Sequence, residues 1–477
     1  MSTPTTAAPP QAAAVKSPKW IWLGVAIGLG LLIALIPTPP GLSRPAQLVL
    51  AIAAFTIVLW ATEFMNNGVA SVFMMGLLIV AGIRVPLVLS GFSAGSFWTL
   101  LAVLYYGFAM RKTGLAERLS YYILSLFPGS YRGVLTAFFV IGFILALGIP
   151  SMTVRTAIMA PIAWALCQSL GLSPLSTGSA LIIITVVEMA VTPGIAFLYG
   201  SLNGPVVAQM FMTKALPLSW TGYARIMTVP NLIQCGLILL INPLILRPEK
   251  PLNASSEFAR GKLKALGAFK RQEAITGIVV LVSIFMWATQ DKLHHIPAFV
   301  IGMLAMAVFA VTGILQDSDV AGGVSWTLLL FLGGIFGLAN VIPEYKITDW
   351  LAGYFVPIAQ QLIWSPVLLL LVVCVAMLIF RFLDPTAFIA IPVLFLPLVD
   401  SLSKAGIPPM VLTAPLVLAS APFWMPYMNF WIAMGEGMTG KQAFTRGQLF
   451  KLANIYALAC LLSVAIGSLY WKAIGAL

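Results

Sequence analysis

The sequence predicts an all-α protein that crosses a membrane many times. Of its 477 residues, 60% are hydrophobic and only 8% are charged, and the mean hydropathy is +1.01. A soluble domain is roughly half apolar and about a quarter charged, so this chain lacks the charges needed to cover a water-facing surface. Apolar runs long enough to span a bilayer, about 20 residues, recur from Trp20 almost to the end. We expect about 11 transmembrane helices and two re-entrant hairpins.

Composition also excludes several classes of protein. The net charge of +12 comes from Lys and Arg in short segments between apolar runs, which is typical of cytoplasmic loops, and no basic stripe with interleaved aromatics indicates nucleic acid. His294 and His295 are the two histidines, and the four cysteines lie in apolar runs without the spacing of a metal site. We therefore expect no enzyme, metal site or cofactor, with Na⁺ or H⁺ as a coupling ion.

Unbroken apolar runs alternate in a regular order with runs that proline, glycine or polar residues interrupt. The expected unbroken spans are 20–36, 47–65, 68–83, 96–112, 226–246, 274–290, 296–314, 322–341 and 449–471, and broken crossings are expected at 175–211 and 407–434. Two further apolar stretches, 132–168 and 364–399, are interrupted by proline and polar residues. The expected organisation is a disordered cytoplasmic tail (1–18), a first span with repeat 1 (19–246), a cytoplasmic linker (247–273) and repeat 2 (274–477).

Charge placement supports this topology. Basic residues follow the fourth, sixth and tenth crossings, and they share one side only if 132–168 and 364–399 enter and leave on the same side as hairpins. Irregular backbone at membrane depth is tolerated only where protein or a water-filled cavity satisfies its polar groups. We expect a bacterial inner-membrane protein with a cytoplasmic N-terminus and an extracytoplasmic C-terminus.

The chain also repeats internally. Phe97-Trp98-Thr99-Leu100-Leu101 returns as Ser325-Trp326-Thr327-Leu328-Leu329, and each copy leads into an amphipathic piece, an interrupted hairpin, a broken helix and a final span. The unit has an odd number of crossings, so the second copy is expected to be inverted. Inverted repeats with interrupted segments in matching places indicate a transporter with its site near the midplane.

Four breaks carry the polar residues that such a site needs. The first hairpin breaks at Pro150–Thr156 and contains an intramembrane arginine, which is costly and usually functional, although a hydroxyl-lined kink is the alternative. In the second, Arg381 and Asp384 are spaced to form a structural ion pair, or to serve an anion site or a proton or Na⁺ exchange. Glu188 either carries a proton or pairs with an arginine such as Arg155. The predicted substrate-binding residues are Ser151, Met152, Thr153, Arg155, Thr192, Asn203, Arg381, Thr386, Pro426 and Asn429, and the predicted ion-coupling residues are Ser151, Gly200, Asp384 and Glu188.

Two hairpins and two broken helices in an inverted repeat resemble the divalent-anion/sodium symporter (DASS) family of the wider ion-transporter superfamily. Local matches are Ser151-Met152-Thr153 with Pro161, where the family has Ser-Asn-Thr and a later proline, and Ser420–Asn429, which resembles the family's Thr-Pro-Pro-Asn break. The stretch 218–233 resembles the start of the family's last span in a repeat. The likeness covers nearly the whole chain from about residue 20.

The resemblance implies a homodimer of scaffold and transport domains, elevator-like movement, and di- or tricarboxylate or sulfate substrates held between the two tips. Met152 replaces the Asn that in the family contacts Na⁺ and substrate, and the second Ser-Asn-Thr is absent, leaving Thr386 as its counterpart. We hypothesise that Arg155 and Arg381 supply fixed positive charge where relatives bind Na⁺, giving an exchanger or an H⁺-coupled carrier of small organic anions. The alternatives are an inorganic oxyanion or arsenite-type carrier and an Na⁺-independent anion channel.

Overall fold

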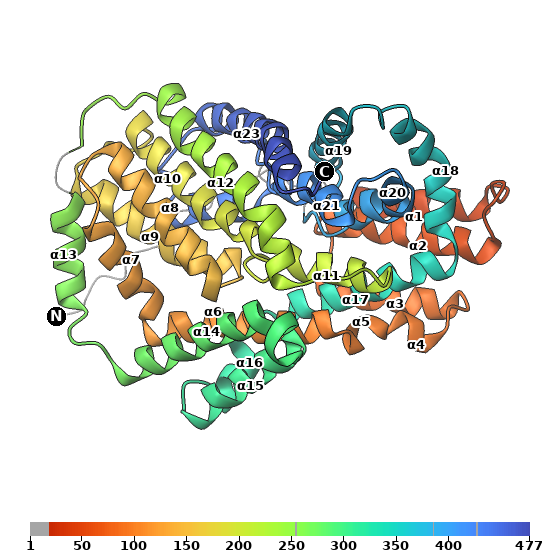
Figure 1. Cartoon of the computed structure of the whole chain (residues 1–477), viewed down its shortest axis with the longest axis horizontal. Helices are drawn as coiled ribbons and strands as arrows, with labels where there is room; N and C mark the ends of the chain where they lie inside the picture. The colour runs from red at the N-terminus through yellow and green to blue at the C-terminus, as the bar shows by residue number, and fades with distance from the viewer. Residues whose placement is uncertain (1–18, 253–254, 385, 426–427) are drawn as a thin grey trace.

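The computed structural model describes residues 19–252, 255–384, 386–425 and 428–477, and all regular structure within these ranges is helical (Figure 1). The predicted all-α class is therefore confirmed. The tail predicted at 1–18 and the predicted site residue Pro426 lie outside the described residues.

The helices follow the predicted order closely. The first half contains α1 (Lys19–Leu35), α2 (Arg44–Ala61), α3 (Asn67–Val80), α4 (Val85–Val88), α5 (Ser90–Ser93), α6 (Gly95–Thr113), α7 (Leu115–Ser125), α8 (Tyr131–Gly148), α9 (Met152–Ser169), α10 (Thr177–Val191), the 3₁₀ helix η1 (Thr192–Ala196), α11 (Asn203–Thr213) and α12 (Trp220–Ile245). After α13 (Ser255–Ala265), the second half contains α14 (Arg271–Thr289), the π-helix η2 (Gln290–His294), α15 (Ala298–Val311), α16 (Asp317–Gly322), α17 (Trp326–Glu344), α18 (Ile347–Gln360), α19 (Pro366–Phe380), α20 (Ala390–Lys404), α21 (Pro409–Leu418), α22 (Phe430–Met438) and α23 (Arg446–Ala473).

Seven of the described helical segments have the length and apolar composition to cross a membrane by themselves. They are Arg44–Ala61, Tyr131–Gly148, Thr177–Ala196, Trp220–Ile245, Arg271–His294, Trp326–Glu344 and Arg446–Ala473. Shorter apolar helices of 10–17 residues accompany them, including α3, α15 and α19. Short helices are expected where the chain enters the membrane only part of the way or breaks within it.

The order of elements in α6–α12 recurs in α17–α23. In each copy a long helix leads to an amphipathic one (α7, α18), then a helical hairpin (α8–α9, α19–α20), then a broken helix and a long final helix. The two final helices, α12 and α23, pack against each other, as do the long first helix α17 and α3 of the opposite half. The sequence repeat is therefore a repeat of structure.

Two large apolar cores hold most of these elements. The smaller of the two is formed mainly by α1–α3, the start of α6 and α17, and the larger by most of the remaining helices. A small third cluster contains Ala146, Ala196 and Phe197. Leu202 and Phe388, which come from two of the breaks, are buried in the smaller core. The breaks thus lie where the two cores meet.

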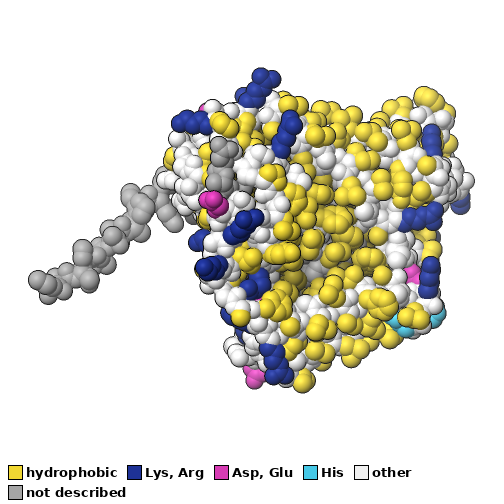
Figure 2. All heavy atoms as spheres, turned by 60° about the vertical axis from the view of Figure 1, so that its left-hand side comes forward, with side chains coloured by type: hydrophobic (Ala, Val, Ile, Leu, Met, Phe, Trp, Pro, Cys, Tyr) yellow, Lys and Arg dark blue, Asp and Glu magenta, His cyan; other side chains and the backbone are white. Residues whose placement is uncertain are grey.

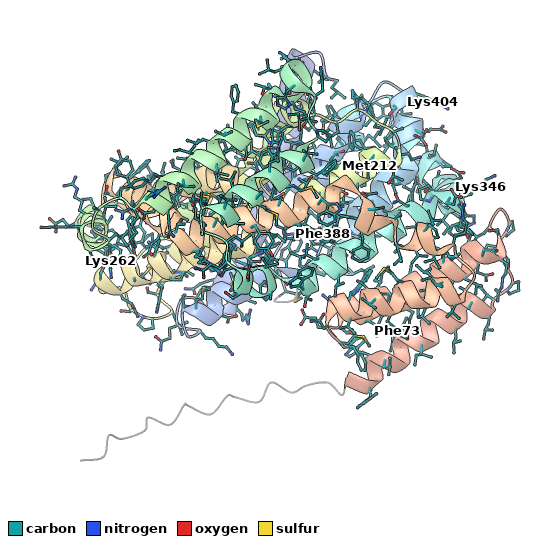
Figure 3. The ribbon with its side chains drawn as sticks, turned by 90° about the horizontal axis from the view of Figure 1, so that it is seen from below. Phe73, Met212, Lys262, Lys346, Phe388 and Lys404 are labelled. Carbon is teal, nitrogen blue, oxygen red and sulfur yellow. The ribbon has the colours of Figure 1, made fainter. Side chains whose placement is uncertain are left out.

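The surface has the pattern that a bilayer requires. Hydrophobic side chains cover a broad face, and Lys and Arg gather towards its two edges (Figure 2). Lys262 lies at one end of the molecule and Lys346 and Lys404 at the opposite end, with Phe388 between them (Figure 3). Large apolar side chains such as Leu240 and Leu281 are 69% and 67% exposed, as is expected of side chains that contact lipid.

Candidate functional site

A cavity of about 570 Å³ lies between the two hairpin tips and helices α3, α6 and α17. The first tip contributes Ser151 and Thr153, and the second contributes Thr386. The facing helices contribute Asn67, Thr327 and the ring of Phe331, and the rings of Phe388 from the second tip and Trp431 from α22 also line the cavity. Three residues predicted to bind substrate, from segments more than 200 positions apart, therefore share one cavity.

The first tip is a helix start. Helix α8 ends at Gly148, and Ser151 caps α9 by accepting a hydrogen bond from Val154 N at 3.3 Å. The first N–H groups of α9 form a positive helix end. Thr153 Oγ1 accepts a bond from Trp431 Nε1 of α22 at 3.2 Å. Met152, in contrast, is buried and does not line the cavity.

Arg155 lies beneath this tip, fully buried. Among the described residues its guanidinium donates to main-chain carbonyl oxygens alone: Nε to Ala190 at 2.6 Å, Nη1 to Ile149 at 2.6 Å and to Gly200 at 2.7 Å, and Nη2 to Val191 at 3.3 Å. These carbonyls come from the end of α8, the end of α10 and the turn before α11. They are left over by the breaks, since the last carbonyls of a helix lack partners within it.

Glycine is required beside this guanidinium. A Cβ atom on Gly194, in η1, would lie 2.1 Å from Gly200 O and 2.4 Å from Arg155 Nη2. The predicted ion-coupling residue Gly200 takes part through its carbonyl oxygen, which accepts from Arg155. The broken helix thus closes tightly around a fixed cation.

The second tip is organised by Asp384. Its carboxylate accepts hydrogen bonds from Thr386 N at 2.9 Å and Thr386 Oγ1 at 2.7 Å, and from Ile389 N and Ala390 N at 2.9 and 2.8 Å. Asp384 therefore satisfies the free N–H groups at the start of α20. Arg381 is buried, and its Nη2 donates to Met428 O at 2.5 Å, in the break between α21 and α22. Each tip arginine thus bonds to the backbone of a broken helix.

The remaining predicted residues gather in the broken helices. Asn203 Nδ2 donates to Ser420 Oγ at 2.8 Å and joins the two breaks directly. Asn429 caps α22 by accepting from Ile432 N at 3.2 Å, and its Nδ2 donates to Ala421 O at 3.1 Å. A second cavity, of only about 10 Å³, brings Glu188, Thr192 and Asn429 together with Tyr456. Glu188 accepts from Asn242 Nδ2 at 2.7 Å, and in the described part of the chain it forms no ion pair with Arg155.

Arg111, one of the basic residues that follow the fourth predicted crossing, also lines the cavity. It lies in the last turn of α6, its side chain is exposed, and it contributes the one charged group to the lining of the 570 Å³ cavity among the described residues. The adjacent Lys112 instead pairs with Asp319 of α16. That hydrogen bond, with one from Gln316 N, holds the pKa of Asp319 below its usual value. The contacts that these neighbouring basic residues make with distant segments therefore separate them: Arg111 lines the cavity and Lys112 pairs with Asp319.

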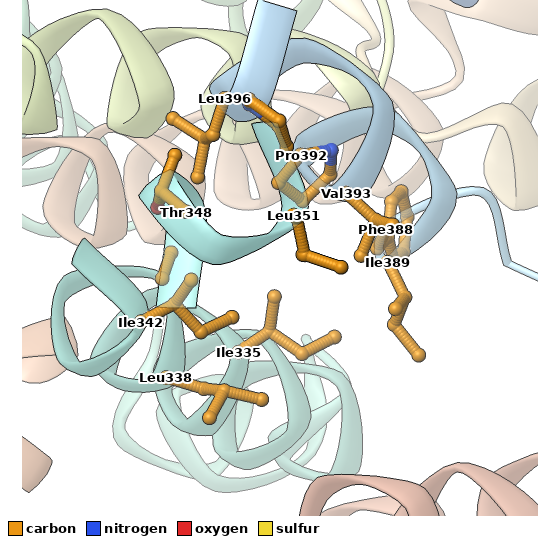
Figure 4. A pocket seen from close by; sticks show the side chains of 12 residues that line it. Ile335, Leu338, Ile342, Thr348, Leu351, Phe388, Ile389, Pro392, Val393 and Leu396 are labelled. Carbon is orange, nitrogen blue, oxygen red and sulfur yellow. The ribbon is translucent and has the colours of Figure 1, made fainter. Parts of the chain in front are cut away.

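A further hollow of about 40 Å³ between α17, α18 and α20 is unsuited to an anion. Its walls are almost entirely apolar, with Ile335, Leu351 and Pro392 facing one another (Figure 4). Thr348 is the only hydroxyl that lines it. We attribute this hollow to imperfect packing where helix α20 lies against the smaller core.

Known proteins share both this fold and this sequence pattern. The crystal structure of the YdaH transporter of Alcanivorax borkumensis, described as having an unusual topology, matches with a TM-score of 0.56 at 17% identity, covering 91% of this chain and 99% of that one. Dicarboxylate transporter 1 from spinach (Spinacia oleracea) chloroplasts is 25% identical over 465 residues, covering 94% of this chain and 80% of the relative. The putative malate transporter YflS of Bacillus subtilis is 25% identical over 471 residues, covering 96% and 97%.

The family relationship covers the whole described fold. The family model for the sodium:sulfate symporter transmembrane region matches residues 17–477, which include both hairpins, both broken helices and both cavities. The resemblance seen in the sequence is thereby confirmed. The chain belongs to the sodium:sulfate symporter family, also known as the divalent-anion/sodium symporter family, and is an integral membrane transporter of anions, not an enzyme.

Proposed function

We propose that this transporter carries small organic anions of the di- or tricarboxylate class and exchanges them without Na⁺. The names of the spinach and Bacillus subtilis relatives support a dicarboxylate such as malate. The 570 Å³ cavity supports a small molecule, since ligand pockets of about 300–1,000 Å³ are typical for such ligands. Ser151, Thr153 and Thr386 provide hydroxyls, and the start of α9 provides N–H groups that favour negative charge.

One observation carries the Na⁺-independent part of the proposal: the guanidinium of Arg155 binds carbonyl oxygens from three separate segments. Carbonyls freed by broken helices are the groups that hold Na⁺ in transporters of this general design. A guanidinium is a permanent cation with five donors in a fixed geometry. In our proposal it takes the structural place of a bound metal cation and keeps that charge throughout the cycle.

Arg381 extends the argument to the second tip. Its Nη2 bonds to Met428 O, so each hairpin tip sends one arginine to a broken helix. Two permanent cations near the tips supply positive charge that favours an anion without a co-transported metal ion. Arg155 itself is buried behind the tip and does not line the cavity, so we assign it a positioning and charge-compensating role, with Ser151, Thr153 and Thr386 contacting the substrate.

The remaining parts of the proposal concern movement and assembly. The hairpins and broken helices are proposed to move together as a transport domain against a scaffold that contains the smaller core, by an elevator mechanism within a homodimer. The position of the cavity at the boundary between the two cores supports this. The basic residues after α6 and in 247–273 support a cytoplasmic N-terminus.

The test is uptake of radiolabelled malate by the purified full chain in liposomes. Liposomes preloaded with unlabelled malate should take up label several-fold faster than empty ones, and replacing Na⁺ by choline should leave the rate unchanged. Full dependence on Na⁺ would overturn the assignment of Arg155. Single-channel currents without stimulation by internal malate would indicate a channel, and transport confined to arsenite or sulfate would indicate an inorganic anion carrier.

A further inference from the structure

Glu188 is a buried carboxyl group with an incomplete set of partners. It lies in α10, is 3% exposed, and accepts one hydrogen bond, from Asn242 Nδ2 at 2.7 Å. Its other oxygen, Oε1, has no hydrogen-bond partner among the described residues. The same amide nitrogen of Asn242 also donates to Thr185 Oγ1 at 3.0 Å. Most buried polar groups in proteins are fully bonded, so this arrangement needs an explanation.

The carboxyl group borders a cavity that reaches both broken helices. The cavity of about 10 Å³ is lined by Glu188 and Thr192 from the α10–η1 break, by Asn429 from the α21–α22 break, and by Tyr456 of α23. Thr192 Oγ1 also lacks a partner among the described residues. A volume of about 10–15 Å³ holds one water molecule. The site therefore has room for a water that connects the carboxyl group with the polar residues of both breaks.

Few ionisable groups face Glu188 from the elements packed around α10. They are Cys235 from α12, and Tyr456 and Cys460 from α23. Tyr131 of α8 lies near Gly178 at the far end of α10, and Glu436 of α22 pairs with Arg446. Arg155 contacts the backbone next to Glu188, because it binds the carbonyls of Ala190 and Val191, two and three residues after Glu188. Its donors are already directed at carbonyls, so Glu188 has no direct counter-charge among the described residues.

The net charge of the buried groups around the breaks depends on whether Glu188 is protonated. The buried charged residues there are Arg155, Arg381, Asp384 and Glu188. When Glu188 is ionised, the two arginines and two carboxylates cancel. When Glu188 holds a proton, one net positive charge remains to attract an anion. A proton and an anionic substrate therefore favour each other's binding.

We propose that Glu188 is a proton-binding site linked to the anion site, so that the carrier moves H⁺ together with its substrate. This inference rests on the proposed function and adds the coupling ion to it. The proton binds to a carboxylate oxygen on one side of the membrane and leaves from it on the other, with no other bond formed or broken. Exchange of one anion for another does not require release of the proton, whereas net uptake does.

The test compares exchange with net uptake in liposomes that contain purified wild-type protein or Glu188→Gln. In the wild type, an inward proton gradient (about pH 7 outside and about pH 9 inside) should accelerate net malate uptake about fivefold or more, the lower range of such linkages. Malate keeps both charges throughout this pH range. Glutamine mimics the protonated side chain, so Glu188→Gln should still exchange malate but lose the acceleration. Glu257→Gln, at an exposed carboxyl in α13, is the matched control and should behave as wild type.

A second measurement does not depend on the variant folding. When malate is added to wild-type protein in weakly buffered detergent solution, the protein should take up close to one proton per malate bound. A pH-sensitive dye measures this proton uptake. The role of Glu188 would be refuted if the proton gradient accelerated net malate uptake equally in Glu188→Gln, or if wild-type protein bound malate without taking up a proton. Wild-type malate exchange, combined with net uptake that the proton gradient does not accelerate, refutes this inference alone. Absence of malate exchange in the wild type refutes the proposed function.

Discussion

Arg155 Nη1 donates a hydrogen bond to the carbonyl oxygen of Gly200 at 2.7 Å, across 45 residues of sequence. This contact joins the first hairpin tip to the broken helix α10–η1–α11. The same guanidinium bonds to Ile149 and Ala190, so three irregular segments converge on one charge. Four predictions follow from this geometry and its surroundings.

Replacing Arg155 by Gln should strongly destabilise the protein and abolish malate uptake. The variant leaves several buried carbonyl oxygens without donors, and each buried acceptor left unsatisfied costs about 1–3 kcal/mol. Arg155→Lys keeps the charge but offers fewer donors, so we expect an intermediate loss. Thermal unfolding in detergent and uptake in liposomes measure both effects. The control is Arg225→Gln, an exposed arginine that donates to Ile474 O at the surface; equal effects of both Gln variants would contradict the assignment.

Gly194→Ala should reduce transport sharply, although it adds only one methyl group. The new Cβ atom would meet Gly200 O at 2.1 Å and Arg155 Nη2 at 2.4 Å, so the backbone around the guanidinium must move. Overpacking of this kind costs about 1–3 kcal/mol. Gly236→Ala in α12 is the matched control, because nothing lies within 4 Å of its Cβ position. A Gly194→Ala protein with wild-type uptake and unfolding temperature would show that the broken helix is not held tightly by Arg155.

Arg111→Gln should raise the KM for malate about fivefold, with little change in stability. An exposed charge a few ångströms from a bound anion contributes about 1 kcal/mol, and salt screens it, so the difference from wild type should shrink at high ionic strength. Lys112→Gln is the neighbouring control: it removes the same charge, but from a side chain that pairs with Asp319 and does not line the cavity. Arg111→Lys should restore most of the affinity. An equal rise in KM in both Gln variants would point to the general basic potential of this surface.

Glu249→Gln should lower stability at neutral pH but not in acid. Burial opposes ionisation of this carboxylate, but hydrogen bonds from the N–H groups of Thr177 (2.7 Å) and Gly178 (3.2 Å), which begin α10, outweigh it and lower the pKa of Glu249 below its ordinary value of 4.5. A lowered folded-state pKa stabilises the protein above the unfolded value, and the contribution disappears as the pH falls through the folded value.

The measurement for Glu249 is the unfolding temperature in detergent at neutral pH and at about pH 3, a value below the ordinary pKa of a glutamate. The wild type should unfold above Glu249→Gln at neutral pH, and the two should converge in acid. Glu257→Gln, at an exposed carboxyl that makes none of these bonds, is the control. A difference that persists in acid would mean that shape, and not charge, accounts for the effect of Glu249.

The breaks were predictable because proline, glycine and hydroxyl residues disrupt helices locally. The interruption predicted at 150–156 covers part of the gap between α8 and α9 and the first residues of α9. The one at 192–205 includes η1, and the one at 420–429 falls between α21 and α22. The shared cavity of Ser151, Thr153 and Thr386 agrees with the substrate site that we propose. The pairing of Glu188 with an arginine, left open from the sequence, is not what the structure has: Glu188 bonds to Asn242.

Hydropathy, helix breakers and repeated segments can be read from neighbouring residues, so they were enough to predict a helical membrane protein built from a repeated, interrupted unit. The partners of each buried charge depend instead on the packing of distant segments. The carbonyls that bind Arg155 lie 6, 35 and 45 residues away along the chain. The adjacent basic residues Arg111 and Lys112 have different surroundings, the cavity for one and Asp319 for the other. Contacts over such distances depend on how the helices pack, and no pattern of neighbouring residues specifies them.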